Sequence, residues 1–301
     1  MNGDTMGRVF FFSPHPDDET LSMGLAMLHY IANGYDVHLV SVTVGDALGV
    51  ANTLNGAANG TPVTCTNPTD HPYIHNPSRE GIPEFTAEMV GASRVLEARS
   101  ALGAMAMVPL VPGATAGTVT HHVEALHDGF GANGSGSSTA PVTPEGIAAA
   151  KDVIKRYVDT YPNSFFYTMS ETDDHHDHAA CGFALRELKN DTVNTVPYND
   201  NLTYAQALTN ARFFVSKLYW ENNYAKGADV KTMPGLAWFN YYGTNYDRYC
   251  AWMRDQVIKT YRAWNPAAGS YAIGYHSVVS QFNNCFPAPG GTVKQANLWH
   301  G

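Results

Sequence analysis

Acidic and imidazole side chains are concentrated in two short segments of this chain. The first, PHPDDE at 14–19, follows the apolar run 9–12 after one serine, and the second, ETDDHHDHAACG at 171–182, follows the apolar run 164–170. Imidazoles and carboxylates in such excess are the ligands that divalent cations take in proteins. A bound cation would also remove the repulsion between adjacent acids, because its charge dominates the local field. The two segments together indicate a metal site.

Each segment alone also has an ordinary structural explanation. Acids at 17–19 would complement the positive end of a following helix, and DDHHDH at 173–178 would suit a solvated loop. The position of the segments in the predicted fold favours a metal site over the structural explanation. Both segments follow predicted strands of one sheet, and α/β proteins bind ligands beyond the carboxyl ends of such strands. We therefore expect the two segments to face each other.

The elements that would position these segments alternate between strand and helix patterns. Strands are expected at 9–13, 35–46, 105–113 and 164–170. Helices are expected at 21–32, at 86–102 with Gly103 as the C-terminal stop, and from the start signal Thr143-Pro144-Glu145 onwards. This order predicts an α/β fold with a mostly parallel sheet and helices on both faces.

Two long segments interrupt the alternation, and both are candidates for active-site loops. Residues 47–84 are rich in Gly, Asn, Pro and Thr, and residues 113–142 include GFGANGSGSS. Loops beyond about 15 residues are often lids or binding loops. Three histidines near the second loop are expected to be solvated: His121, His122 and His127.

The last third of the chain is rich in aromatic residues. All five tryptophans lie after residue 219. This enrichment favours additional hydrophobic core, and the alternative is a wall for a large apolar ligand. We expect a single domain over 1–301, with a core at about 7–190 and the aromatic-rich part at about 200–301.

Composition limits the partners and the location. The net charge is −9 with only 18 Lys and Arg and no basic run, so no nucleic-acid partner is expected. No apolar stretch approaches the ~20 residues of a membrane helix, and no signal-peptide pattern opens the chain, so a cytoplasmic location is expected. The four cysteines form no CxxC pair and are expected to be reduced and buried. The oligomeric state stays open.

The paired motifs resemble the PIG-L/LmbE family of zinc-dependent N-acetylglucosaminyl deacetylases. The family signature is (A/P)HPDDE followed by HPDHxA, and His176 here replaces the proline at a spacer position. SRVLEARSALGA at 93–104 resembles the R-x-x-E-x-x-x-A-x-x-LG helix of the family. YHSVVSQF at 275–282 resembles its H-x-SQ element with two extra residues. The resemblance spans nearly the whole chain and implies a Rossmann-like α/β fold.

The resemblance also implies the roles of individual residues. His15, Asp18 and His178 would bind zinc. Asp17 would be the general base. A zinc ion with an open coordination position activates water, and a free carboxylate beside it takes the second proton. Of the two adjacent aspartates, one would therefore bind zinc and the other would accept the proton.

Other residues would assist the reaction. His175 would stabilise the oxyanion or protonate the leaving amine, oriented by Asp177. The arginine that matches Arg94 contacts substrate hydroxyls in the family. The alternative for Arg94 is a surface helix arginine paired with Glu97. Glu19 is expected to support its neighbours or the helix end.

Two other protein classes use similar residues. Two histidines and a carboxylate also form the triad of non-haem iron oxygenases, which usually have His-x-Asp or His-x-Glu on antiparallel sheets. Here the spacing is His-x-x-Asp and the predicted sheet is parallel. In a non-enzymatic sugar-binding protein, Asp17 would be a costly extra charge.

The expected substrate is a small-molecule glycoconjugate. The two long loops and the aromatic last third make the pattern similar to the deacetylases of glycopeptide antibiotic biosynthesis, of the teicoplanin or A40926 type. These act on the N-acetylglucosamine of an aromatic pseudoaglycone. Deacetylases of the mycothiol type, with smaller substrates, are the alternative.

Overall fold

The structure, a computed structural model, describes residues 6–55, 63–64, 74–75, 81–134, 140–197, 199–215, 237–238, 246–284 and 298–300. Its main sheet contains, from edge to edge, β10 (Ala237–Trp238), β13 (Leu298–His300), β9 (Arg212–Phe214), β6 (Phe165–Met169), β1 (Arg8–Ser13), β2 (Asp36–Thr43) and β5 (Val119–Leu126). The five strands from β9 to β5 are mutually parallel, and β13 pairs antiparallel with both of its neighbours, β9 and β10. The predicted mostly parallel sheet is confirmed.

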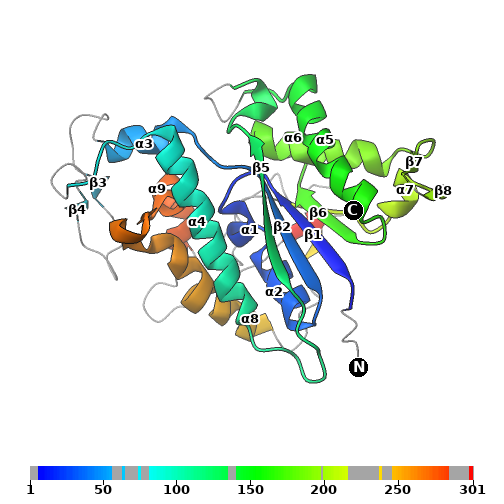
Figure 1. Cartoon of the computed structure of the whole chain (residues 1–301), viewed down its shortest axis with the longest axis horizontal. Helices are drawn as coiled ribbons and strands as arrows, with labels where there is room; N and C mark the ends of the chain where they lie inside the picture. The colour runs from blue at the N-terminus through cyan, green and yellow to red at the C-terminus, as the bar shows by residue number, and fades with distance from the viewer. Residues whose placement is uncertain are drawn as a thin grey trace.

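Helices cover both faces of this sheet (Figure 1). The side chains of β1 alternate between the two faces. Val9 and Phe11 pack with α2 (Gly24–Ala32) and α4 (Ala87–Ala106). Phe10 and Phe12 pack on the opposite face, where α5 (Pro144–Thr160) and α6 (His176–Lys189) lie. A strand buried on both faces explains why the run 9–12 is continuously apolar.

Shorter elements complete the described chain. The helices are α1 (Asp18–Leu21), α3 (Leu48–Leu54), η1 (Phe130–Ala132), α7 (Tyr204–Ala207), α8 (Tyr246–Trp252), η4 (Met253–Val257), η5 (Ile258–Arg262), η6 (Pro266–Ala268), α9 (Ile273–Ser277) and α10 (Val279–Asn284). The strands are β3 (Val63–Thr64), β4 (Ile74–His75), β7 (Thr195–Val196), β8 (Asn199–Thr203), β11 (Trp264–Asn265) and β12 (Ser270–Tyr271).

Two of the expected helix starts are confirmed by their capping bonds. The Thr86 side chain accepts the backbone N–H of Met89 at the start of α4, and Thr143 does the same for Gly146 at the start of α5. The predicted stop at Gly103 is wrong, because α4 continues through it to Ala106. A single glycine lowers helix stability without ending the helix when the flanking turns pack against the core.

The predicted strand at 105–113 is also wrong, because its first residues complete α4. The strand that pairs with β2 is β5, which lies inside the segment expected to be a loop. His121 and His122 are therefore half-buried strand residues. His121 Nε2 lies 2.8 Å from Ser41 Oγ, and His122 Nε2 lies 3.0 Å from His38 Nδ1. His127, just beyond β5, is exposed as expected.

The C-terminal aromatics that the structure describes are mainly core. The side chains of Tyr249, Tyr261, Tyr275 and Phe282 are fully buried in the same cluster as Val9 of β1. Trp252 and Trp264 are partly buried and pack against that cluster. Trp220, most of 47–84 and the side chains of Trp238 and Trp299 lie outside the described residues.

Cys181 is a buried free thiol, and Cys250 is partly buried. Cys65 and Cys285 lie outside the described residues. Within the described parts of the chain, no helix combines the length and the apolar character needed to cross a membrane.

Candidate metal and catalytic site

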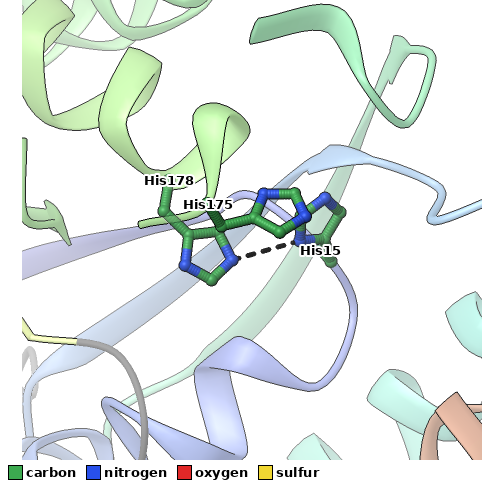
Figure 2. A group of neighbouring side chains, drawn as sticks. All are labelled: His15, His175 and His178. Atoms are coloured by element: carbon green, nitrogen blue, oxygen red, sulfur yellow. Dashed lines mark hydrogen bonds between the residues drawn. The ribbon is translucent and has the colours of Figure 1, made fainter. Parts of the chain in front are cut away.

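The two motif segments meet at the carboxyl edge of the sheet. β1 and β6 are adjacent parallel strands, so the residues after Ser13 and after Met169 leave the sheet side by side. The first segment leads into α1 and the second into α6. Figure 2 shows the rings of His15, His175 and His178 turned toward one another. The predicted meeting of the two segments is confirmed.

Three ligand-type atoms converge at the centre of this site. Nδ1 of His15 lies 3.2 Å from Oδ2 of Asp18 and 3.3 Å from Nε2 of His178, and the last two atoms are 3.1 Å apart. Ligand atoms about 2.1 Å from a tetrahedral zinc ion are separated by about 3.4 Å. All three side chains are at least 90% buried. The donor set thus fits a zinc ion in both atom type and spacing.

In His15 and His178, the ring nitrogen that points away from Asp18 lies next to a carboxylate. Nε2 of His15 lies 2.9 Å from Oδ2 of Asp177 and 3.3 Å from Oδ1 of Asp128. Nδ1 of His178 lies 3.3 Å from Oδ2 of Asp173. Such carboxylates take the N–H of a metal-binding imidazole and leave its other nitrogen free for the ion. The nitrogens left in this way are the two that converge on Asp18.

The charges around the site favour a cation. Burial lowers the pKa of His15, but Asp128, Asp177 and Asp18 outweigh it and raise the pKa well above its usual value. Burial also lowers the pKa of His178, and the carboxylates of Asp18 and Asp173 overcome it and raise the pKa to about 10. The carboxylates therefore stabilise positive charge where the three ligand atoms meet.

Asp17 is buried beside this centre with an unusual backbone. Its φ is +127°, in a region that side-chain-bearing residues rarely adopt. Its Oδ2 accepts a hydrogen bond from Arg94 at 2.8 Å. Burial raises the pKa of Asp17 to about 7, although the guanidinium of Arg94 opposes the shift. A carboxyl group with a pKa near neutrality is suited to proton transfer.

His175 caps the N-terminus of α6. Its Nδ1 accepts the backbone N–H of Asp177 at 3.3 Å, so the ring proton of the neutral form sits on Nε2. Burial, together with the charges of His15 and His178, lowers the pKa of His175 to about 3. The ring is therefore a neutral donor. One nitrogen of this ring lies within 4.8 Å of one nitrogen of His15 and one of His178. Because Nδ1 already accepts a hydrogen bond and Nε2 carries the proton of the neutral ring, Asp18 is favoured as the third ligand.

The carboxylate of Asp177 has a different partner from the predicted one. Instead of orienting His175, it contacts His15 and accepts the backbone N–H groups of Gly129 (2.8 Å) and Gly131 (2.6 Å). These N–H groups belong to the turn around η1, which packs against the start of α6. These bonds hold the carboxylate of Asp177 against His15. His175 is hydrogen-bonded to the backbone N–H of Asp177 and not to its carboxylate.

Arg94 is buried, so the alternative of a surface arginine paired with Glu97 is wrong. Its guanidinium donates to Asp17, to the carbonyl of Pro16 (2.8 Å) and to the carbonyl of Gly45 (3.3 Å). These bonds anchor the PHPDDE turn. A contact between Arg94 and substrate hydroxyls stays a prediction.

Sequence reasoning missed two acids of this site, Asp128 and Asp173. Asp173 lies inside the second motif segment, which contains more acidic residues than the resemblance gave roles to. Asp128 follows β5, and the signal that could have revealed it was the β-branched pattern of 118–123 ahead of it.

A protein-family model described as PIG-L: GlcNAc-PI de-N-acetylase matches residues 10–189. The chain is 46% identical over 39 residues to a 1D-myo-inositol 2-acetamido-2-deoxy-alpha-D-glucopyranoside deacetylase of Mycolicibacterium vanbaalenii, which covers 13% of this chain and 14% of that protein. The match thus spans about a seventh of that curated relative.

Among solved structures, the chain is similar to a teicoplanin-pathway deacetylase in complex with bog (16% identity, 97% of this chain, 96% of that one, TM-score 0.51). It is also similar to the zinc-inhibited form of teicoplanin deacetylase Orf2 (15% identity, 97% of each chain, TM-score 0.50). A third similar structure is GalB, the 4-carboxy-2-hydroxymuconate hydratase of Pseudomonas putida KT2440 (12% identity, 97% of this chain, 95% of that one, TM-score 0.50). A hydratase and deacetylases share this fold, so the likeness shows the fold alone.

Proposed function

Because this chain belongs to the PIG-L family of GlcNAc-PI de-N-acetylases, we propose that it is a zinc-dependent amide hydrolase that removes the acetyl group from an N-acetylglucosamine residue of a glycoconjugate. The observation that carries the proposal is the triangle formed by His15 Nδ1, Asp18 Oδ2 and His178 Nε2, with the buried carboxylate of Asp17 next to it in the chain. The iron oxygenase and the sugar-binding protein give no task to that second carboxylate.

The residues around the triangle supply the groups that amide hydrolysis needs. When bound by His15, Asp18 and His178, zinc supplies a Lewis acid that polarises the acetamide carbonyl and acidifies water. Asp17 accepts the proton that water loses as it attacks the carbonyl carbon. His175 donates its Nε2–H to the carbonyl oxygen as that oxygen becomes negative. The carbon–nitrogen bond then breaks, and the proton held on Asp17 passes to the leaving amine.

The neutral state of His175 distinguishes between its two expected roles. A neutral ring whose Nδ1 is occupied by a backbone N–H can donate from Nε2, but it carries no extra proton to give away. We therefore assign His175 to the oxyanion and the protonation of the amine to Asp17.

We further propose that residues 1–301 act as one deacetylase domain. The support is the shared core, since Tyr249 and Tyr275 of the last third pack in the same cluster as Val9 and Phe11 of β1. A C-terminal part with its own separate core would not do this.

For the glycoconjugate, our first candidate is the N-acetylglucosamine of a glycopeptide antibiotic pseudoaglycone. The length of the segment 47–84 supports a large substrate. The segment 113–142 does not add to this support, because β5 and η1 occupy much of it. The described aromatics do not add to this support, because they are mainly core. The second candidate is a smaller conjugate of the mycothiol type, favoured by the local 46% identity to the deacetylase from M. vanbaalenii.

Metal content and acetate release, measured on the same variants, test the activity. His178→Ala should lower the zinc content, because three protein ligands become two. Asp17→Asn should keep zinc and lower acetate release by roughly 10²–10⁴-fold, the usual effect of losing a general base. His122→Ala, which alters a histidine of the edge strand β5, is the control and should change neither quantity.

Normal zinc content in His178→Ala would remove the ligand assignment. If Asp17→Asn loses zinc together with activity, Asp17 is a ligand and not the base. Iron in the purified protein, with oxygen uptake in place of acetate release, would favour the oxygenase.

A further inference from the structure

We infer that Tyr261, far along the chain from both motifs, is a positioning residue for Asp17 and acts through Glu19. The inference rests on the proposed function, because it concerns the carboxylate that we take as the general base. Tyr261 lies in η5 and is fully buried, as is Glu19 in α1.

The hydrogen bonds form a continuous chain from Tyr261 to the backbone of Asp17. The phenol of Tyr261 donates to Oε1 of Glu19, and the hydroxyl of Thr20 donates to the same oxygen at 2.7 Å. The other carboxylate oxygen, Oε2, accepts the backbone N–H of Asp17 at 2.8 Å. Glu19 is thus held by two hydroxyls on one side and holds the peptide of Asp17 on the other.

The backbone of Asp17 needs such a restraint. At φ +127° and ψ −30°, an L-residue is strained, and such a conformation persists only where the surroundings enforce it. The same conformation brings the carboxylate within 2.8 Å of Arg94. If the N–H of Asp17 lost its acceptor, the peptide could relax and the carboxylate would leave this position.

Tyr261 is itself held by the C-terminal third. Gly274 of α9 lies against its ring, and a Cβ at position 274 would sit 2.7 Å from Cδ1 of Tyr261. The N-terminus of α9 is fixed by Glu97 of α4, which accepts the backbone N–H groups of Ile273 (2.7 Å) and Gly274 (2.8 Å). The position of the phenol therefore depends on the packing of α9 against α4.

This arrangement gives a function to the carboxylate of Glu19, whose burial would otherwise only destabilise the fold. A fully buried acid is rarely kept unless hydrogen bonds or charges compensate it. Glu19 was expected from the sequence to support its neighbours or the helix end. Its bonds to Tyr261 and to the N–H of Asp17 make the first role specific.

Tyr261→Phe is the direct test, because it removes one oxygen and leaves the ring. We expect kcat to fall about tenfold or more, the cost of a displaced catalytic group, while KM and zinc content stay unchanged. Tyr30→Phe is the matched control. It removes a phenol of another buried pair, the hydroxyls of Tyr30 and Tyr167 at 2.5 Å, and should leave kcat unchanged. In the Asp17→Asn background, Tyr261→Phe should cause no further loss, because it acts only through Asp17.

Glu19 provides a second, independent test. The amide oxygen of Glu19→Gln can still accept the N–H of Asp17, and its NH₂ can donate to the two hydroxyls, so this variant should keep most of its kcat. Glu19→Met has a similar length and no acceptor, and it should lose at least as much as Tyr261→Phe. This comparison holds whether or not Tyr261→Phe folds.

Three results would overturn the inference: equal kcat values for Glu19→Gln and Glu19→Met, zinc loss in Tyr261→Phe, or a full further loss when Tyr261→Phe is added to Asp17→Asn. A fully active Tyr261→Phe enzyme beside an inactive Asp17→Asn enzyme would remove the inference and leave the proposed function standing. An active Asp17→Asn enzyme would remove the inference together with the general-base role of Asp17, whereas a wild-type protein that releases no acetate would remove the proposed function.

Discussion

Two adjacent carboxylates of the site have opposite electrostatic environments. Burial raises the pKa of both, but His178 and His15 outweigh it at Asp18 and hold that pKa well below its usual value. At Asp17 the single guanidinium of Arg94 does not outweigh burial. Groups whose surroundings push their pKa values apart usually have different tasks. This supports an ionised ligand at Asp18 and a proton acceptor at Asp17.

Glu97 should make the stability of the protein depend on pH. Burial raises its pKa to about 7, although the N–H groups of Gly274 and Ile273 oppose the shift. The folded state therefore binds a proton that the unfolded state has released. Its contribution to stability is complete below about pH 4.5 and is lost as the pH rises through 7.

The change that tests this is Glu97→Gln, which does not titrate. The difference in the free energy of unfolding, variant minus wild type, should increase by up to about 3 kcal/mol between pH 4.5 and pH 8. Urea unfolding in the presence of a chelator, at a series of pH values, measures it without the metal site contributing. A difference that stays constant across this range would contradict the assignment.

At the scale of elements, short turns at the carboxyl edge of the sheet hold the imidazoles in place. The turn around η1 passes so close to α6 that a Cβ on Gly131 would lie 2.4 Å from the carbonyl oxygen of His176. The N–H of Gly131 also bonds to Asp177, which in turn holds His15. The backbone of this turn therefore orients a metal ligand without providing one.

Two glycine-to-alanine changes should affect different properties, one zinc binding and the other the stability of the fold. Gly131→Ala should displace the turn from Asp177 and weaken zinc binding by about 10–100-fold, the usual effect of losing a group that orients a ligand. Gly103→Ala should leave zinc binding unchanged and stabilise the fold by about 0.5–1 kcal/mol, because Gly103 is exposed within α4 and has open space around it. Zinc titration and thermal unfolding of both variants measure these effects. Unchanged zinc affinity in Gly131→Ala would show that Asp177 does not need this turn.

At the scale of the whole molecule, substrate size is the property to test. If the long segment 47–84 encloses a large conjugate, contacts with the remote part of that conjugate help to orient the acetamide, so a truncated substrate loses turnover as well as affinity. We expect kcat/KM to be lowest for free N-acetylglucosamine and highest for an N-acetylglucosaminyl glycopeptide, with a mycothiol-type precursor between them. Acetate release from the three substrates measures this order. If the mycothiol-type precursor is best, the second candidate replaces the first and the hydrolase remains.

Local patterns in the sequence were sufficient to predict that the two motif segments meet, whereas the assignment of His15, Asp18 and His178 as zinc ligands came from the resemblance to the PIG-L family. His15 and Asp18 lie three residues apart directly after a buried strand, and His178 lies in the first turn of a helix after another. Because β1 and β6 are parallel neighbours, the spacing within each segment and the rule for strand ends bring the three residues together. The parallel sheet and the starts of α4 and α5 were predictable for the same reason, since they depend on neighbours in the chain.

Contacts between residues far apart in the chain were decided only by the tertiary structure. Three such contacts join segments more than 70 residues apart. They are the bond from Tyr261 to Glu19, the bond from the buried Arg94 to Asp17 and the contact of Asp128 with His15. The same applies to the choice of β5 as the edge strand. Periodicity and capping signals describe how a segment interacts with its own neighbours, whereas these contacts follow from which faces pack together when the core closes.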